Sequence, residues 1–258
     1  MDNRYFEIPH CDWMGDQMSL ANKLVLITGA AHRVGRELAL AVAREGGDVV
    51  IHYGNSGADA QGLLEEIQGL DRKAYLLQAD LNDPAQVSTL ISRASEFGRL
   101  DALVNNAAIF QSLNWQTTTI DDWNRHLMVN LTTPFLLSQA FANQIPPDET
   151  GRIINLLDWR ASRPAADHLP YTISKSALAA LTHSLAIALA PHITVNGLAL
   201  GAVLPPSEGV APANILKNVP AGRWADLAEV GQALIFLLDG PAYITGEIIH
   251  VDGGRHLV

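Results

Sequence analysis

The feature that most constrains the fold is a regular alternation of short apolar runs with longer segments of helical spacing. Strand-like runs lie at 23–28, 48–53, 73–78, 102–107, 152–157, 193–198 and 247–251. A segment with helical spacing, 36–47, follows the first run and ends in two glycines. This order predicts a parallel sheet covered by helices on both faces. With right-handed crossovers it gives a doubly wound α/β fold, whose ligands bind beyond the carboxyl ends of the strands.

No linker, repeat or shift of composition divides the chain after about residue 20. Its 258 residues, of which 48% are hydrophobic, can bury one large core. We therefore predict a single α/β domain over residues 21–258. Residues 1–20 are expected to form an extension that is either flexible or clasps a partner.

Charge and cysteine content exclude several classes of protein. The formal net charge of −10 argues against nucleic acid or an anionic membrane as the main partner. A single cysteine, Cys11, cannot form an internal disulfide, and the nine histidines show no ligand spacing, so no metal is expected. Neither a signal peptide nor a run of about 18 apolar residues is evident, which predicts a cytoplasmic protein.

The segment TGAAHRVG, residues 28–35, follows the first predicted strand and opens the first predicted helix. Gly29 permits a tight turn there, and Gly35 permits close packing of the helix. Free N–H groups at the helix start suit a pyrophosphate, although any strand-to-helix turn can need glycine. The middle position, where such loops commonly carry a third glycine, is Arg33.

Tyr171 and Lys175 are four residues apart in a segment that reads as a long helix from Tyr171 onward. This spacing places them on one helical face, where an ammonium would lower the phenol pKa and allow proton transfer near neutral pH. Taken alone, the pair could equally be a surface tyrosine and lysine of an amphipathic helix.

These features occur together with Asn105-Asn106-Ala107 after the fourth predicted strand and with Asn130 in a predicted helix. In order and separation the set resembles the short-chain dehydrogenase/reductase family, from about residue 22 to the closing VDGG at 251–254. The resemblance implies a single Rossmann-type domain, nicotinamide-dependent hydride transfer and a homotetramer.

The same resemblance implies roles for individual residues. Tyr171 would be the proton donor, Lys175 would hold the cofactor ribose and lower the tyrosine pKa, and Asn130 would anchor a water leading to that lysine. Asn106 would line the cofactor channel, and Asp80 would contact the adenine amino group. Further positions expected to bind the cofactor are Gly29, Arg33, Val34, Gly35, His52, Tyr53, Asn55, Ser56, Leu81, Ala107, Tyr171 and Gly201.

Two departures from the general family pattern resemble its pteridine reductase branch. Asp158 stands where a serine usually precedes the tyrosine by thirteen residues, and Arg33 replaces the middle glycine. The resemblance implies that Asp158, Arg33 and Tyr171 contact a pterin ring, which Phe110 would stack against the nicotinamide. In the alternative, Arg33 points to solvent, Asp158 pairs with Arg160 or Arg163, and Phe110 is an apolar loop anchor.

Segment 52–56, at the end of the second predicted strand, contains no acid that would select NAD. Arg33, Asn55 and Ser56 could donate to the 2′-phosphate of NADP, so NADPH is the expected cofactor, although the branch typically has a basic residue at position 55. Segment 203–219 is expected to form a substrate lid. The alternatives are a reductase of a ketone, sugar or 3-oxoacyl thioester, or an NADP-binding regulatory protein without turnover.

Overall fold

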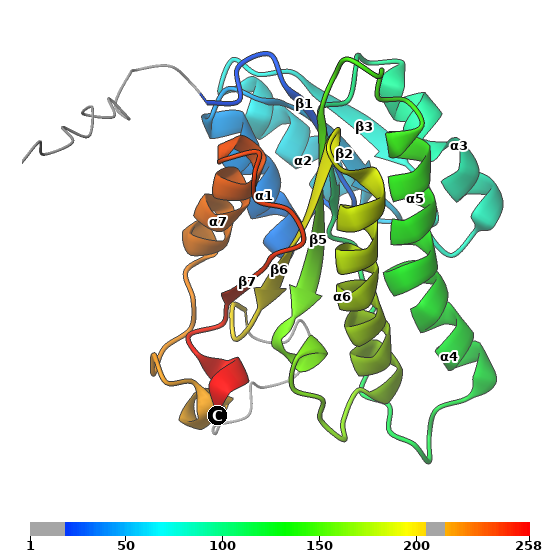
Figure 1. The fold of residues 1–258 in the computed structure, drawn as a ribbon, viewed down its shortest axis with the longest axis vertical. Coiled ribbons are helices and arrows are strands. Elements are labelled where there is room, and N and C mark those ends of the chain that lie inside the picture. The colour runs from blue at the N-terminus through cyan, green and yellow to red at the C-terminus, as the bar shows by residue number, and fades with distance from the viewer. Residues whose placement is uncertain (1–18, 205–214) are drawn as a thin grey trace, which may run out of the picture.

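The computed structural model of the protein describes residues 19–204 and 215–258. Most of the expected N-terminal extension, and most of the expected lid, lie outside these residues. Seven parallel strands form one sheet with the order β3-β2-β1-β4-β5-β6-β7 (Figure 1). The strands are β1 (Leu24–Ile27), β2 (Asp48–Tyr53), β3 (Ala74–Gln78), β4 (Ala102–Asn105), β5 (Gly151–Asp158), β6 (Ile193–Leu200) and β7 (Ile248–Val251). The predicted doubly wound α/β fold is confirmed, and each strand overlaps a predicted run.

Helices cover both faces of the sheet (Figure 1). They are α1 (Arg33–Arg44), α2 (Gly57–Gln68), α3 (Pro84–Ser95), α4 (Ile120–Leu127), α5 (Thr133–Ala142), α6 (Leu169–Leu189) and α7 (Leu227–Asp239). One apolar core joins α1, α2 and α7 to the sheet, and a second joins α3, α5 and α6 to the opposite face. Because β1 and β4 are buried on both faces, they are continuous apolar runs rather than alternating ones.

Helix starts differ from one another in a way that bears on the site. Asp83, Thr119 and Asp226 accept backbone hydrogen bonds at the starts of α3, α4 and α7. At the start of α1, by contrast, His32 makes no side-chain cap hydrogen bond, and the first turn contains no acidic residue. This helix begins at Arg33, three residues before the predicted start, so the glycine-spaced loop is partly helical.

Asn130 lies in a short π-helical segment, Met128–Thr132, that joins α4 to α5. The sequence predicted an ordinary helix at this position. A π-helical turn inserts an extra residue, which rotates a side chain relative to the flanking helices, and such turns are frequent at functional sites. Here the segment directs the fully buried Asn130 toward α6 and the loop after β4.

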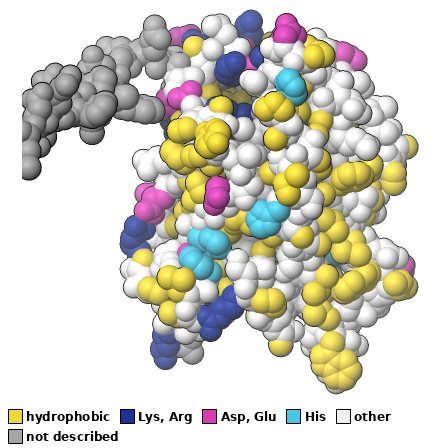
Figure 2. All heavy atoms as spheres, in the orientation of Figure 1, with side chains coloured by type: hydrophobic (Ala, Val, Ile, Leu, Met, Phe, Trp, Pro, Cys, Tyr) yellow, Lys and Arg dark blue, Asp and Glu magenta, His cyan; other side chains and the backbone are white. Residues whose placement is uncertain are grey.

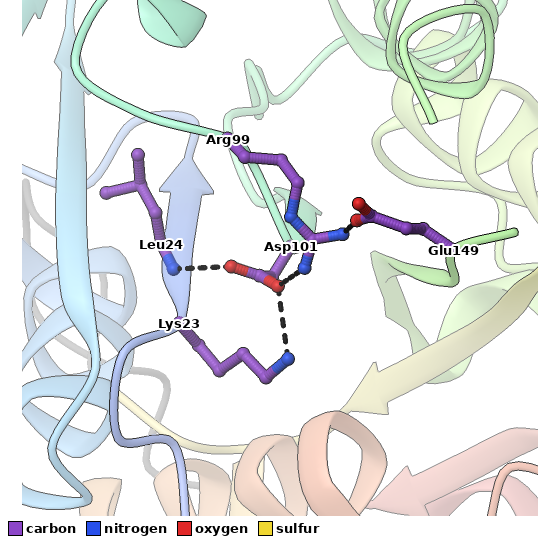
Figure 3. A network of polar contacts seen from close by, with 5 residues as sticks. All are labelled: Lys23, Leu24, Arg99, Asp101 and Glu149. Atoms are coloured by element: carbon purple, nitrogen blue, oxygen red, sulfur yellow. Dashed lines mark hydrogen bonds and ion pairs between the residues drawn. The ribbon is translucent and has the colours of Figure 1, made fainter. Parts of the chain in front are cut away.

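Polar side chains tie the amino-terminal edge of the sheet together (Figure 3). The carboxylate of Asp101 accepts hydrogen bonds from the backbone N–H of Leu24 at 2.9 Å and from Nζ of Lys23 at 3.2 Å. Arg99 pairs with both Asp101 and Glu149. This network joins the start of β1 to the segment before β4, at the edge opposite the glycine-containing loop.

A cavity of about 280 Å³ lies at this amino-terminal edge, between Tyr75, Phe97 and the charged groups just described. Both carboxylates of its lining have partners within the protein, as in the bonds from Lys23 to Asp101 and from the backbone N–H of Lys73 to Asp48. In doubly wound sheets ligands bind at the opposite, carboxyl edge. We therefore place the candidate site at the carboxyl edge.

Among the described residues, one helix, α6, has the length and apolar composition that would suffice to cross a membrane. It packs against the sheet through a buried side that carries Tyr171, Ser174 and Lys175. A core helix of this kind satisfies the same criterion of length and composition. Its remaining apolar residues include the exposed Ile173 and Ile187.

Candidate active site

The candidate site lies at the carboxyl ends of β1, β4, β5 and β6, around the point where the strand order reverses between β1 and β4. Strands β1 and β4 pair in register from Val25 with Ala102 to Ile27 with Val104. The loops that follow them therefore leave the sheet side by side. Crevices at such reversal points are the usual ligand sites of this architecture.

Thr28 and Asn106 lock these two loops together. The hydroxyl of Thr28 accepts hydrogen bonds from the N–H groups of Asn106 and Ala107 at 2.9 and 3.0 Å. In return, Nδ2 of Asn106 donates to the carbonyls of Thr28 and Gly29 at 2.8 and 3.0 Å. The sequence reasoning assigned Asn106 to the cofactor channel and gave Thr28 no role. A hydroxyl at the end of a buried strand, beside a glycine turn, was the available signal.

Glycine is required twice in the loop after β1. Gly29 has a φ of 61°, which is the left-handed region. A Cβ on Gly35 would lie 2.2 Å from the carbonyl oxygen of Gly29 and 2.6 Å from Nδ2 of Asn106. The predicted tight turn and close helix packing are thus both confirmed. Their consequence is that the first turn of α1 sits directly against the loop.

Arg33 also has a positive φ, of 55°, although it is not a glycine. Left-handed backbone costs a non-glycine residue on the order of 1 kcal/mol or more, and it is concentrated at functional sites. The exposed side chain of Arg33 stands at the start of α1, at the positive end of the helix dipole. A helix start with a guanidinium, no acid and no side-chain cap suits an anionic group such as a pyrophosphate.

His52 was predicted to contact the cofactor, and that contact stays a prediction, while the structure gives its side chain two partners within the protein. The ring is buried at the end of β2, where Nδ1 accepts from the N–H of Gly29 at 3.0 Å and Nε2 donates to the carbonyl of Ala79 at 3.1 Å. Burial lowers the pKa of His52 to about 4, which keeps the ring neutral and able to accept. His52 therefore supports the glycine turn from below.

The other positions predicted for the cofactor differ in how exposed their side chains are. Asn55 and Asp80 are exposed at the carboxyl edge, and Oδ1 of Asp80 accepts from the N–H of Asn82. The side chain of Leu81 is buried in the second core, so only its backbone could reach a ligand. Ala107 and Val34 are half-buried beside the loop, and so are Tyr53 at the end of β2 and Ser56 after it. Gly201 packs against Asp252 just after β6.

Tyr171, Asp158 and Lys175 come together at the ends of β5 and α6. The phenol of Tyr171 donates to Oδ2 of Asp158 at 3.1 Å, and Oδ1 of Asp158 accepts from the backbone N–H of Arg160 at 2.8 Å. Nζ of Lys175 donates to the carbonyl of Leu156 at 2.5 Å and lies 5.8 Å from the centre of the Tyr171 ring. Both Tyr171 and Lys175 are buried.

The pKa values in this cluster correct one expectation. Burial, the charge of Asp158 and the hydrogen bond to it raise the pKa of Tyr171 well above its usual value. Lys175 was expected to lower that pKa, but in this arrangement the neighbouring carboxylate and the loss of solvation prevail. Burial also raises the pKa of Asp158 and lowers that of Lys175 to about 8. The phenol is therefore held in its protonated, proton-donating form.

The predicted alternative pairing of Asp158 with arginine side chains is not found. The side chain of Arg160 pairs with Asp167 at 2.7 Å, and only its backbone N–H contacts Asp158. The carboxylate is thus bound on one oxygen by backbone and on the other by Tyr171.

Asn130 braces the loop after β4 against α6. Its Oδ1 accepts from the N–H of Ile109, and its Nδ2 donates to the carbonyl of Ile109 and to Oγ of Ser174, all at 2.9 to 3.0 Å. Ser174 in turn donates to the carbonyl of Tyr171. Asn130 is thus linked to the tyrosine through Ser174, which the sequence reasoning missed. The water that Asn130 was expected to anchor stays a prediction.

Phe110 forms an aromatic wall beside Tyr171. Its ring meets Tyr171 edge to face, with centroids 4.6 Å apart, and stacks on His168 at 4.0 Å with an interplanar angle of 12°. His168 just precedes α6 and was not singled out from the sequence. Over half of Phe110 remains exposed, at 54%. The ring is therefore held in place and still has surface that a flat ligand could contact.

The chain is similar in sequence to known proteins over most of its length. Residues 29–256 match the sequence model of a family described as enoyl-(acyl carrier protein) reductase. Over 241 residues the chain is 32% identical to a 3-oxoacyl-(acyl-carrier-protein) reductase of Synechocystis sp., in an alignment that covers 92% of this chain and 98% of that protein.

The chain is also similar to solved structures over most of its length. The FolM alternative dihydrofolate reductase 1 from Brucella suis, in complex with NADP, is 34% identical with a TM-score of 0.85, covering 93% of this chain and 97% of that one. A blue fluorescent protein from a metagenomic library, in complex with NADPH, is 32% identical with a TM-score of 0.86, covering 92% and 99%. With its sheet order, glycine turn and Tyr171–Lys175 pair, the chain belongs to the short-chain dehydrogenase/reductase family.

Proposed function

We propose that the protein is an NADPH-dependent reductase of a pteridine, either a dihydropterin or a dihydrofolate-like ring. The observation that carries this proposal is the hydrogen bond from Tyr171 to Asp158. A carboxylate stands where the ketone reductases of the family usually have a serine. It can accept from two adjacent N–H groups of a pterin, whereas a ketone offers no donors at all.

NADP(H) fits the residues at the carboxyl edge. The uncapped start of α1 and Arg33 would hold the pyrophosphate, and Asn55 and Ser56 would donate to the 2′-phosphate. Segment 52–56 contains no acid to repel that phosphate. Two structural relatives were solved with NADP or NADPH, which supports the same assignment. When bound, the cofactor supplies the hydride that reduces the C=N bond of the substrate.

The protein's own part in the reaction is proton delivery. Hydride transfer to the carbon of a C=N bond leaves the nitrogen in need of a proton. Tyr171, whose pKa is raised by burial and by Asp158, is a protonated side-chain donor hydrogen-bonded to Asp158. A water near Asp158 would then return a proton to Tyr171 from solvent. Lys175 would bind the cofactor ribose through its buried ammonium.

A rival within the family is reduction of a 3-oxoacyl thioester, which the Synechocystis relative supports through its name. Ketones and sugars are further alternatives. Steady-state NADPH oxidation with dihydrobiopterin, dihydrofolate, a 3-oxoacyl thioester and a ketone panel separates these activities. We expect turnover with a dihydropteridine, and turnover with the thioester alone would overturn the proposal.

A regulatory protein that binds NADP without turnover is the alternative outside catalysis. Tyr171 donates a hydrogen bond to Asp158, and Nζ of Lys175 lies 5.8 Å from the centre of the Tyr171 ring. A protein that only binds NADP would not need this arrangement. The same assays decide this case, because a regulator would bind NADP and oxidise no NADPH with any substrate.

We also propose that the protein is a cytoplasmic homotetramer. Hydrophobic side chains gather over the side formed by α4, α5 and α6 (Figure 2). The exposed hydrophobic residues of α5 and α6 include Phe135, Ile173 and Ile187. Ile187 is 82% exposed, which favours burial against another copy. Light scattering after gel filtration gives the assembly mass, and an Ile187→Lys variant of lower mass would support this face as the interface.

A further inference from the structure

We propose that Arg160 and Arg255, gathered over Trp159 beside Asp158, bind a carboxylate carried by the substrate, so that the enzyme prefers pteridines with an anionic side chain. The inference rests on the proposed function and adds the substrate class. The two arginines and Trp159 are separate from the residues assigned above to the cofactor and to proton delivery.

Two distant segments bring these cations together. Trp159 and Arg160 begin a short 3₁₀ turn directly after Asp158, and Arg255 begins another after β7. The guanidinium carbon of Arg160 lies 4.7 Å from the centre of a Trp159 ring, and that of Arg255 lies 4.3 Å from one. Trp159 directly follows Asp158, so the two guanidinium groups that lie against its rings are held beside the candidate proton relay.

Placing two cations together has a cost that the contacts of the protein do not fully offset. Burial and the charge of Arg160 lower the pKa of Arg255. The side chain of Arg160 is only 11% exposed, and the Nε atoms of both arginines are buried without a hydrogen-bond partner. Unsatisfied buried donors are rare, and here they belong to two planar groups that match a carboxylate in geometry.

Most of the acidic side chains near the two arginines form hydrogen bonds with other groups. Asp158 bonds Tyr171 and a backbone N–H, and its pKa is raised by burial. Asp252 bonds His256 and two backbone N–H groups. Among residues 19–204 and 215–258, only Asp167, whose side chain is 53% exposed, pairs with a guanidinium of the cluster. Within this part of the chain, two positive charges thus face one solvated acid, in a protein whose net charge is −10.

The position of the Trp159 cluster beside Asp158 would let the enzyme distinguish pteridines by the side chain that they carry. A pteridine ring paired with Asp158 and Tyr171 would place its substituent close to the Trp159 cluster. Dihydrofolate carries two carboxylates on that substituent, whereas dihydrobiopterin carries neutral hydroxyls. A charge-assisted pair of hydrogen bonds should therefore favour dihydrofolate, and it would also favour other carboxylate-bearing pteridines.

The test compares kcat/KM for dihydrofolate and for dihydrobiopterin in the full-length protein. Arg255→Met should lower the ratio of the two values about tenfold, the usual effect of losing one charged hydrogen bond. Arg255→Lys, which keeps the charge and loses the planar fork, should give an intermediate ratio. Arg163→Met removes an exposed arginine from the same loop and should leave the ratio as it is in the parent.

Asp167→Asn provides a change in the opposite direction. It releases a guanidinium nitrogen of Arg160 from its carboxylate, so KM for dihydrofolate should fall while KM for dihydrobiopterin falls less. A merely structural role for the cluster would weaken both substrates equally in every variant. Equal effects on the two substrates in both Arg255→Met and Asp167→Asn would overturn the inference.

Failure of the proposed function is recognised separately. If the parent protein reduces neither pteridine, the pteridine assignment is wrong, and the anion subsite is tested by calorimetry with p-aminobenzoylglutamate on the NADP-loaded protein. Binding that Arg255→Met weakens about tenfold supports the subsite, and identical isotherms for parent and variant overturn it. Thermal unfolding of each variant verifies that the fold is retained.

Discussion

The phenol of Tyr171 donates a hydrogen bond to the carboxylate of Asp158 across 3.1 Å. Each group changes the other: the carboxylate helps to raise the tyrosine pKa, and the phenol opposes the rise that burial causes in Asp158. A neutral phenol is the form that can give a proton to a substrate nitrogen. The pair therefore favours the reductive direction, in which Tyr171 acts as an acid.

Replacing Tyr171 by phenylalanine should remove turnover and leave the fold intact. The hydroxyl is the proposed proton source, and general acid catalysis typically contributes about 10²–10⁴-fold. We expect kcat to fall by at least about 100-fold while NADPH affinity, measured by fluorescence titration, stays within about threefold. If Tyr171→Phe retains parental kcat, another group must deliver the proton.

Asp158→Asn should move the alkaline limb of the pH profile to lower pH. Burial is the largest cause of the raised pKa of Tyr171, and the charge of Asp158 and its hydrogen bond come next. Asparagine keeps the shape and removes the charge, so the phenol should ionise at a lower pH. The measurement is kcat/KM for the best substrate between about pH 6 and 11. An alkaline limb that stays in place would show that Asp158 does not govern Tyr171.

Lys175→Met should stabilise the protein near pH 7 and lose this advantage at high pH. Burial lowers the pKa of Lys175 from 10.5 to about 8, so between these values the unfolded chain binds more protons than the folded one. The cost of the buried ammonium is complete below about pH 8 and vanishes as pH rises toward 10.5. It amounts to about 3 kcal/mol, reduced by the lost bond to Leu156.

Urea unfolding of Lys175→Met and parent at pH 7 and at pH 10 measures this difference. The exposed Lys73→Met serves as the control, and its effect on stability should be small at both pH values. A gain for Lys175→Met that is equal at the two pH values would mean that burial does not perturb the lysine. Activity should be lost in Lys175→Met regardless of its stability.

The sheet, the glycine turn and the Tyr171–Lys175 pair could be predicted because each has a local signal, whereas Asp158 was assigned from the family resemblance. Buried parallel strands are continuous apolar runs, and the spacing of Tyr171 and Lys175 needs only a helix. The direction of the Tyr171 pKa shift was wrong because it depends on burial. Burial is a property of the packed chain, and no spacing in the sequence reports it.

The missed residues share one cause. Thr28, Ser174 and His168 act through partners that are far away in sequence, such as Asn106, Asn130 and Phe110. The support that His52 gives to the glycine turn was missed for the same reason, since its position at the end of β2 is visible in the sequence and the direction of its ring is not. The cluster over Trp159 joins residues almost 100 positions apart, which the pairing of β5 with β6 and of β6 with β7 brings together.

Gly35→Ala should destabilise the protein and weaken NADP binding together. A methyl group at this position would lie 2.2 Å from the carbonyl oxygen of Gly29, so the helix start must move away from the loop. Overpacking of this kind typically costs about 1–3 kcal/mol. The displaced first turn of α1 would also no longer present its N–H groups to a pyrophosphate, so we expect NADP affinity to fall by at least about tenfold.

Gly62→Ala is the matched control, since Gly62 lies inside α2 and a Cβ there would meet nothing within 4 Å. Alanine in an open helical position should stabilise the protein by about 0.5–1 kcal/mol, with NADP affinity unaltered. Urea unfolding and NADP titration of both variants complete the comparison. Both variants introduce the same methyl group. Opposite effects on stability would therefore assign the loss in Gly35→Ala to the contact between Gly35 and the loop after β1. Equal stability and equal affinity in the two variants would mean that the loop does not depend on this contact.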